Sequence, residues 1–224
     1  MPEPPAPLAR PGAPDAAPAA LVPPADFAGG DVALLTDADY LLAAQALGCE
    51  LAAIKAVADV EASGGGFLAD GRPKILFEAH LFSRFTKRRF DATHPAISSA
   101  VWNQKLYKRG AAEYGRLAQA ITLDRRMALQ AASWGKFQIL GMHFTRCGHP
   151  TVDAFVAAMC TSERRHLEAF VRFIRADAKM LAALVERRWD AFAFRYNGAG
   201  YKANRYDEKM AAAYAKHAAA IPRT

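Results

Sequence analysis

From Thr36 onward, apolar residues recur at helical spacing along most of the chain, and glycine or proline interrupts them at intervals. Thr36 or Asp37 can cap a first helix, which stops at Gly48, because their side chains accept hydrogen bonds from the unpaired amides of a first helical turn. A second helix is expected from about Glu50 to Glu61, where three consecutive glycines end the pattern. Glu61 therefore lies in, or just past, the last turn of a helix.

One short β segment is expected after these glycines. Asp70-Gly71 lies between two short apolar runs, which is a hairpin signal, and Pro73 restricts the second strand to the edge of a sheet. Helical spacing then covers residues 79–89, 111–121, 124–132, 151–195 in three pieces, and 204–217, with an irregular stretch at 90–110 and a short apolar turn between glycines at 132–141. The pattern thus predicts a mainly α domain with one small β-hairpin.

The first 30 residues have a different composition. They hold nine of the thirteen prolines, mixed with alanine, and end in Gly29-Gly30. Such a segment cannot build a hydrophobic core, so we expect a disordered tail or linker over 1–30 and one domain over 31–224.

The formal net charge of +7 predicts attraction to polyanions, which include nucleic acid, anionic lipid and the acidic polymers of a bacterial wall. Basic clusters at 84–89, 125–126, 164–165 and 187–188 are interpreted as solvated helix faces that could together hold the protein on an anionic wall. The sequence contains no run of about 18 apolar residues and no secretory signal pattern, so no stable membrane insertion is expected.

Cysteine and histidine spacing argues against a metal site. Cys49, Cys147 and Cys160 are odd in number and widely spaced, which predicts reduced thiols in a protein folded in a reducing cytosol. The six histidines show neither an i, i+4 pair nor an H-E-x-x-H motif. We therefore expect neither a metal nor a zinc-dependent reaction.

Glu61 is the first candidate for chemistry. The partial negative charge at the C-terminal end of a helix disfavours a carboxylate by up to about 1 kcal/mol, and apolar neighbours such as Val60 and Phe67 would raise its pKa further. A carboxyl group that stays protonated near neutral pH is the form that donates a proton to a glycosidic oxygen. The alternative is a solvated residue at a helix end, without catalytic function.

Two later loops also place glycine beside polar and aromatic residues, at 133–138 and 196–201. Each alone could be a helix cap. With the Glu61 loop, in this order, they resemble the N-acetylmuramidase family of phage endolysins, within the lysozyme-like superfamily. The segments that carry the resemblance are VEASG at 60–64, GRPKILFE at 71–78, ASWGKFQI at 132–139 and YNG at 196–198, within a region of about 36–217.

This resemblance implies a lysozyme-like helical domain with the hairpin inserted after the catalytic helix. It also implies cleavage of the β-1,4 bond between N-acetylmuramic acid and N-acetylglucosamine, without a cofactor and with Glu61 as general acid. The second catalytic group is Glu78, Asp70 or none. Asp70 could instead serve only the turn, and Glu78 could pair with Arg72 or His80. A separation of about 6.5–9.5 Å between the carboxyls would favour inversion and about 5–5.5 Å retention.

Seven further residues are assigned to the substrate site. Gln138, Tyr196 and Asn197 could hydrogen-bond the N-acetyl and hydroxyl groups of the sugars, and Trp134 is either a sugar platform or part of the core. Ser63 is expected to cap or support the Glu61 loop. The full set is Ser63, Asp70, Ser133, Trp134, Gln138, Tyr196 and Asn197.

Two rival functions remain open. A lytic transglycosylase would cut the same bond with one carboxyl and leave 1,6-anhydro ends. A non-catalytic basic domain would bind the wall or nucleic acid, although the sequence has no recognisable nucleic-acid motif. We expect a monomer whose partner is peptidoglycan, made in the cytoplasm without a signal peptide. It would reach the wall by holin-type release or by specialised secretion.

Overall fold

The computed structural model describes residue 27, residues 29–61 and residues 64–220 of the 224-residue chain. Most of the predicted tail at 1–30, and Ser63, lie outside the described residues. In chain order, with η for 3-10 helices, the elements are α1 (Asp37–Leu47), α2 (Leu51–Glu61), β1 (Ile75–Phe77), α3 (Ala79–Phe85), η2 (Gln104–Leu106), η3 (Gly110–Ala112), α4 (Glu113–Gln130), β2 (Ala132–Trp134), β3 (Ile139–Leu140), η4 (Gly141–His143), α5 (Val152–Met159), α6 (Glu163–Arg175), α7 (Ala178–Val185), α8 (Trp189–Asn197), η5 (Ala199–Asn204) and α9 (Tyr206–Ala220).

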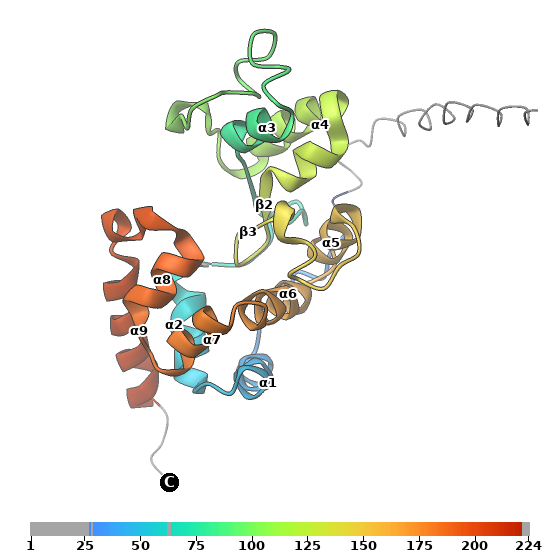
Figure 1. The fold of residues 1–224 in the computed structure, drawn as a ribbon. Helices are drawn as coiled ribbons and strands as arrows, with labels where there is room; N and C mark the ends of the chain where they lie inside the picture. The colour runs from blue at the N-terminus through green and yellow to red at the C-terminus, as the bar shows by residue number, and fades with distance from the viewer. Residues whose placement is uncertain (1–26, 28, 62–63, 221–224) are drawn as a thin grey trace, which may run out of the picture.

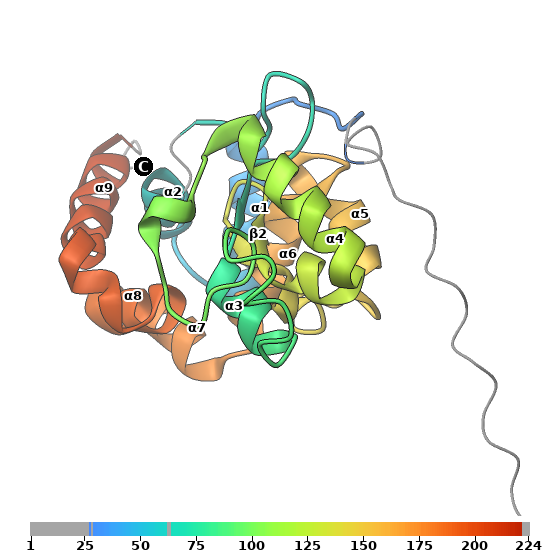
Figure 2. The same ribbon diagram turned by 90° about the horizontal axis from the view of Figure 1, so that it is seen from above.

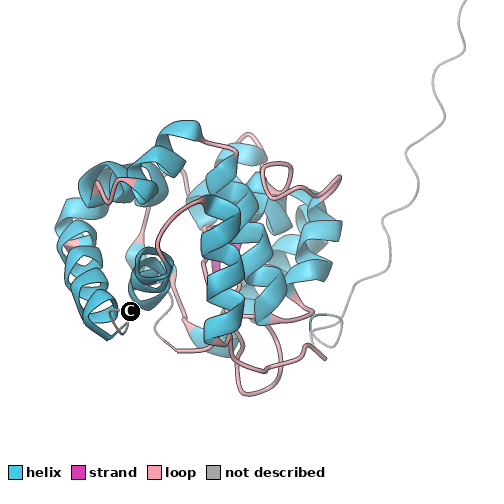
Figure 3. Ribbon diagram, turned by 90° about the horizontal axis from the view of Figure 1, so that it is seen from below, coloured by secondary structure: helices cyan, strands magenta, loops and turns pink. Residues whose placement is uncertain are grey.

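The fold is mainly helical with one small sheet, as predicted. Helices α3 and α4 lie on one side of the small sheet, and α2 with α7, α8 and α9 lies on the other (Figure 1). Seen from above, α9 runs beside α2 at the outer side of this second group (Figure 2). The strands lie deep between helices when the molecule is seen from below (Figure 3).

The two helices that lead to Glu61 follow the sequence pattern closely. The Thr36 hydroxyl accepts a hydrogen bond from the Asp39 amide, and the Asp39 carboxylate accepts one in return from the Thr36 amide, so α1 begins with a complete capping box. Gly48 adopts φ +65°, a left-handed conformation that glycine adopts easily, and ends α1. Helix α2 ends at Glu61, as predicted.

The sheet differs from the predicted hairpin. Asp70 and Gly71 do form a tight turn, but its two sides share only the single bridge Phe67↔Pro73. Strand β1 pairs instead with β2, with Ile75 opposite Trp134. Strand β2, whose three residues are all buried, supplies the partner for β1.

The segment 132–141, predicted as an apolar turn, contains β2 and β3, which pair antiparallel and complete the order β1-β2-β3. The region 151–195, predicted as three helices, contains the four helices α5 to α8. The two helices predicted at 111–121 and 124–132 are both present: they share the label α4, but Asp124 has a non-helical backbone (φ −163°, ψ 96°) and separates them at a kink. The Asp124 carboxylate accepts a hydrogen bond from the Met127 amide, as an N-cap does, so a second helical run begins at the kink.

The core continues upstream of α1. Phe27 is 5% exposed, and its ring centroid lies 5.5 Å from that of Tyr114 and 5.7 Å from that of Trp134. The packed domain therefore includes at least one residue of the predicted tail. None of the helices in the described residues is long and apolar enough on its own to span a membrane; only α1 and α2 together, at a bend of 113°, reach the required length and composition.

Candidate active site

Glu61, at the C-terminal end of α2, faces a cleft of about 340 Å³. The glycine loop after α2, strand β1, the start of η3 and the β2–β3 loop form the rest of its wall. The lining residues are Glu61, Gly65, Leu68, Lys74, Ile75, Leu76, Arg109, Gly110, Gly135, Lys136 and Gln138. Of the residues predicted for the site, Glu61 and Gln138 thus line the same cavity.

The environment of Glu61 favours its protonated form. Burial raises the pKa of its carboxyl to about 7, while a hydrogen bond from Asn197, which favours the carboxylate, acts in the opposite direction. Asn197 Nδ2 donates to Glu61 Oε1 over 2.9 Å. The carboxyl can therefore hold a proton near neutral pH and still has a donor ready for the charge that remains when the proton leaves.

Tyr196, the neighbour of Asn197 in the chain, anchors the end of α8. Its hydroxyl donates to the Phe137 carbonyl over 2.8 Å, and its ring stacks on Phe192 at a centroid distance of 5.6 Å. These contacts join the end of α8 to the β2–β3 loop. Burial raises the pKa of Tyr196 well above its ordinary value, so the phenol stays neutral. A direct contact of Tyr196 with sugar remains a prediction.

Gln138 is held in one orientation by its own loop. Its side-chain Nε2 donates to the Gly135 carbonyl over 2.8 Å and to the Lys74 carbonyl over 3.3 Å, and its Oε1 accepts from the Ser133 hydroxyl over 2.9 Å. The backbone of Gln138 has φ +47°, in the left-handed region that non-glycine residues seldom adopt. Ser133 therefore supports Gln138 from beneath the cleft wall and is itself 7% exposed.

Residues 50–218 match a protein-family model that is described as N-acetylmuramidase. This region contains Glu61, Gln138 and Asn197 together with all four sequence motifs. The chain belongs to the N-acetylmuramidase family.

A solved structure described as the crystal structure of Burkholderia AP3 phage endolysin is 46% identical in sequence, with a TM-score of 0.79. The match covers 85% of this chain and 73% of that one. A comparison with curated proteins gives no significant match. Family and neighbour together make this muramidase a glycosidase-type peptidoglycan hydrolase, and they confirm the endolysin resemblance and the lysozyme-like fold class.

Trp134 requires a correction, because it cannot offer a sugar platform. The side chain of this residue is 1% exposed, packs on Phe27, and donates its indole N–H to the Leu129 carbonyl over 3.1 Å. It belongs to the core beneath the sheet, which is the alternative that the sequence left open.

Asp70 lies in the turn and not on the cleft wall. Its carboxylate accepts two hydrogen bonds from the Arg72 guanidinium, over 2.9 and 2.6 Å, and these bonds hold its pKa below the usual range. The turn role that the sequence allowed for Asp70 accounts for all of these contacts.

Glu78 is placed at the start of α3. Its carboxylate accepts a 2.6 Å hydrogen bond from the Tyr107 hydroxyl and lies 3.2 Å from His80 Nδ1. It is absent from the described lining of the Glu61 cleft. Its pairing with His80 matches one alternative from the sequence.

Two residues of α6 that sequence reasoning missed hold the cleft of the muramidase together. The buried Glu163 carboxylate accepts hydrogen bonds from the Gly66 and Leu35 amides and pairs with Lys136 Nζ at 3.4 Å. Glu163 thereby ties the glycine loop after Glu61 to α6. Glu163 sits in the first turn of an amphipathic helix, where an acid is expected for capping reasons alone, so no sequence signal distinguished it.

His166 is the second missed residue. Its Nδ1 accepts from the Lys136 amide and its Nε2 donates to the Met159 carbonyl, at 3.1 and 2.6 Å. A Cβ added at Gly66 or Gly135 would come within 2.6 or 2.8 Å of its ring, so both glycines are required by close approach. Burial lowers the pKa of His166 to about 4, which keeps the imidazole neutral.

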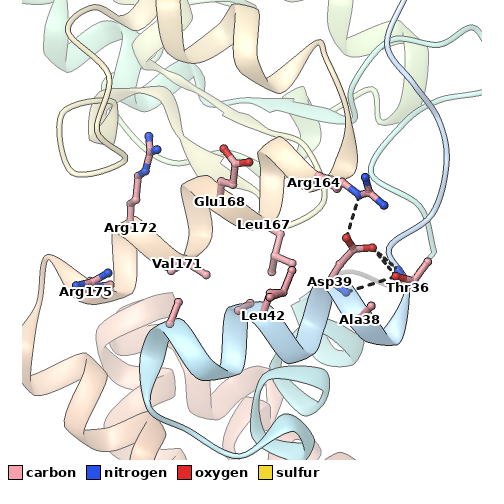
Figure 4. A pocket seen from close by; sticks show the side chains of 12 residues that line it. Thr36, Ala38, Asp39, Leu42, Arg164, Leu167, Glu168, Val171, Arg172 and Arg175 are labelled. Atoms are coloured by element: carbon pink, nitrogen blue, oxygen red, sulfur yellow. Dashed lines mark hydrogen bonds and ion pairs between the residues drawn. The ribbon is translucent and has the colours of Figure 1, made fainter.

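Another cavity, of about 550 Å³, lies elsewhere, between α1 and α6. Figure 4 shows Leu42, Leu167 and Val171 along it, with Arg172 and Arg175 at the side of α6. None of the predicted site residues lines this groove. Within the described residues, no group of three or more His, Cys, Asp or Glu side chains is arranged to hold a metal ion.

Proposed function

We propose that this muramidase cleaves the β-1,4 bond between N-acetylmuramic acid and N-acetylglucosamine, with Glu61 as the general acid. One observation carries the proposal: a carboxyl with a pKa of about 7 faces a cleft and accepts a hydrogen bond from Asn197. A general acid works best when its pKa lies near the working pH, because it is then both protonated and able to give the proton away.

The chemical step follows from these contacts. Glu61 donates its proton to the bridging oxygen as the bond to the sugar carbon breaks, and the ring takes on oxocarbenium character. The carboxylate that remains is stabilised by the Asn197 amide, an interaction that strengthens as charge develops. Gln138, fixed by Ser133, is the proposed partner for an N-acetyl or hydroxyl group of the bound sugar.

Water completes the reaction in a hydrolase, and the muramic C6 hydroxyl does so in a lytic transglycosylase. The second function remains a candidate because Glu61 is the one carboxyl among the described lining residues, and transglycosylation needs only one. Mass spectrometry of digested peptidoglycan distinguishes the two enzymes. Products with 1,6-anhydro ends would indicate a lytic transglycosylase, and products with reducing ends would support a hydrolase.

The deciding experiment measures clearing of isolated walls or permeabilised cells by purified Glu61→Gln. We expect a loss of about 10²–10⁴-fold, the usual contribution of a general acid, in a protein with unchanged circular dichroism. Glu186→Gln, which removes an exposed carboxylate paired with Arg188, is the matched control and should retain full activity. Wild-type rates from Glu61→Gln would refute the assignment.

We further propose that the protein acts on the wall as a monomer. Delivery by holin-type release or by specialised secretion remains a prediction. Deleting a neighbouring holin-like or secretion gene and following lysis would distinguish the two routes.

A further inference from the structure

Three basic side chains line the same cleft as Glu61: Lys74 from the segment before β1, Arg109 from the loop before α4, and Lys136 from the β2–β3 loop. Lys136 Nζ donates to the Gly64 carbonyl over 3.0 Å. The Lys74 ammonium approaches the same glycine, because a Cβ added at Gly64 would lie 3.5 Å from Lys74 Nζ. Two ammonium groups therefore flank Gly64, three residues beyond Glu61.

These cations differ in how they are neutralised. Lys136 forms an ion pair with buried Glu163. Among the ion pairs of the described residues, none includes Lys74 or Arg109. The cleft therefore carries positive charge that the described part of the protein does not balance.

Local contacts do not explain why Lys74 and Arg109 carry cationic side chains. The backbone of Lys74 accepts hydrogen bonds from Gly135 and Gln138, contacts that any residue at this position could make. Arg109 is fixed through its amide, which donates to Glu113 over 2.9 Å in a backbone with φ +60°. Glu113 is itself paired with Arg116, so its charge is already balanced without the Arg109 guanidinium. Both cations are held at the cleft wall while their charged ends remain available.

We propose that Lys74 and Arg109 form a subsite for a carboxylate of the substrate, beside the bond that Glu61 protonates. This inference rests on the proposed muramidase function. The sugar rings of peptidoglycan are neutral, and a lactyl carboxyl that carries a stem peptide is an amide. The carboxylates available are therefore those of the stem peptide and those of lactyl groups that carry no peptide. A neutral N-acetylglucosamine polymer has neither. The subsite would therefore select muramyl glycans by charge, and guanidinium and ammonium groups are suited to carboxylates.

The test compares three substrates at about 150 mM salt, where the Debye length of about 8 Å screens long-range attraction. The first is intact peptidoglycan. The second is the same material with its carboxylates converted to amides by carbodiimide and ammonia. The third is glycan strands freed of stem peptides by an amidase, whose cleavage of the lactyl–peptide amide exposes lactyl carboxylates. The enzyme variants are Lys74→Met, Arg109→Gln and their combination, with Lys179→Met as a control that removes an exposed charge on α7.

We expect the double variant to lose at least tenfold in kcat/KM on intact peptidoglycan, mainly through KM, and to match the wild type on the amidated material. Loss on intact material but not on the stripped strands assigns the subsite to stem-peptide carboxylates, and loss on both shows that it also accepts the lactyl carboxylate that the amidase frees. Lys179→Met should behave as wild type throughout.

Equal rates of the double variant and the wild type on intact peptidoglycan would overturn the subsite, as would an equal loss on the amidated substrate. Either result leaves the proposed reaction standing as long as Glu61→Gln is inactive. Activity of Glu61→Gln on all three substrates would instead refute the reaction itself, so the two failures are distinguishable.

Discussion

Asn197 Nδ2 lies 2.9 Å from Glu61 Oε1, although 136 residues separate the two in the chain. The bond favours the ionised carboxyl, whereas burial favours the protonated one, and burial has the larger effect. The balance leaves the pKa of Glu61 at about 7. Activity that depends on protonated Glu61 should therefore decline as the pH rises through 7.

Removing this hydrogen bond should move that decline to higher pH. In Asn197→Ala the carboxylate loses a donor, so the pKa of Glu61 rises, and the alkaline limb of kcat shifts upward by about one pH unit. The maximal rate should fall, because the charge left on Glu61 is less well stabilised. A pH–rate profile measures both effects. Asn204→Ala, in the exposed η5 turn, is the control, and an alkaline limb unmoved in Asn197→Ala would contradict the account.

The raised pKa of Glu61 also has a cost in stability. Below about pH 4.5 the carboxyl is protonated in both folded and unfolded chains, and no penalty arises. Between this value and pH 7 the unfolded state ionises first, so folding stability falls as the pH rises. Glu61→Gln avoids the penalty, and its gain over the wild type should grow from pH 4 to pH 8 by on the order of 3 kcal/mol, or roughly 5–10 °C in Tm. Glu186→Gln should show no such growth in thermal melts. A gain for Glu61→Gln that is the same at both pH values would contradict the raised pKa.

Gly66 and Gly135 should tolerate no side chain, because the His166 ring occupies the space that a Cβ atom would need at each position. Gly66→Ala places a methyl group 2.6 Å from the imidazole Nδ1, and two hydrogen bonds keep the ring from moving aside. We expect a destabilisation of about 1–3 kcal/mol by chemical denaturation. Gly135→Ala should cost more, since φ at this residue is +70°.

Gly115→Ala serves as the control for both glycine variants. This residue lies within α4 with open space around it, so alanine should stabilise the protein by about 0.5–1 kcal/mol. If Gly66→Ala proved as stable as Gly115→Ala, the packing of His166 described above would be incorrect.

Glu78 should prove dispensable for the chemical step. Its carboxylate is occupied by Tyr107 and His80 and lies outside the described cleft lining, so Glu78→Gln should lose less than tenfold in kcat, about 1.4 kcal/mol in barrier terms. Steady-state assays on isolated walls measure the loss. A larger loss, with the fold intact, would reinstate Glu78 as the second catalytic carboxyl.

Local signals were sufficient to predict the end of α2. The capping box at Thr36, the left-handed Gly48 and the glycines after Glu61 all act within a few residues, so the sequence places the carboxyl at a helix end directly. The order of the motifs added Gln138 and Asn197 to the predicted site. In the structure Gln138 lines the same cleft as Glu61, and Asn197 donates a hydrogen bond to the Glu61 carboxyl.

Non-local contacts account for what the sequence did not predict. Strand β1 pairs with residues 132–134, a partner that neither turn chemistry nor periodicity can select. The sequence left Trp134 as either a sugar platform or part of the core, and the same pairing turns its side chain into the core. Glu163 and His166 occupy ordinary helical positions, and only the folded chain brings them to the glycine loops.

The cleft is formed by segments from distant parts of the chain. Asn197, which donates a hydrogen bond to Glu61, belongs to one of the last of them, at the end of α8. A polypeptide still emerging from the ribosome therefore exposes Glu61 long before Asn197 exists to meet it. Chains that stop short of α8, through incomplete synthesis or proteolysis, lack this donor and the Tyr196 anchor that positions it. The hydrogen-bonded state of Glu61 is thus acquired late, as a property of the finished molecule and not of its fragments.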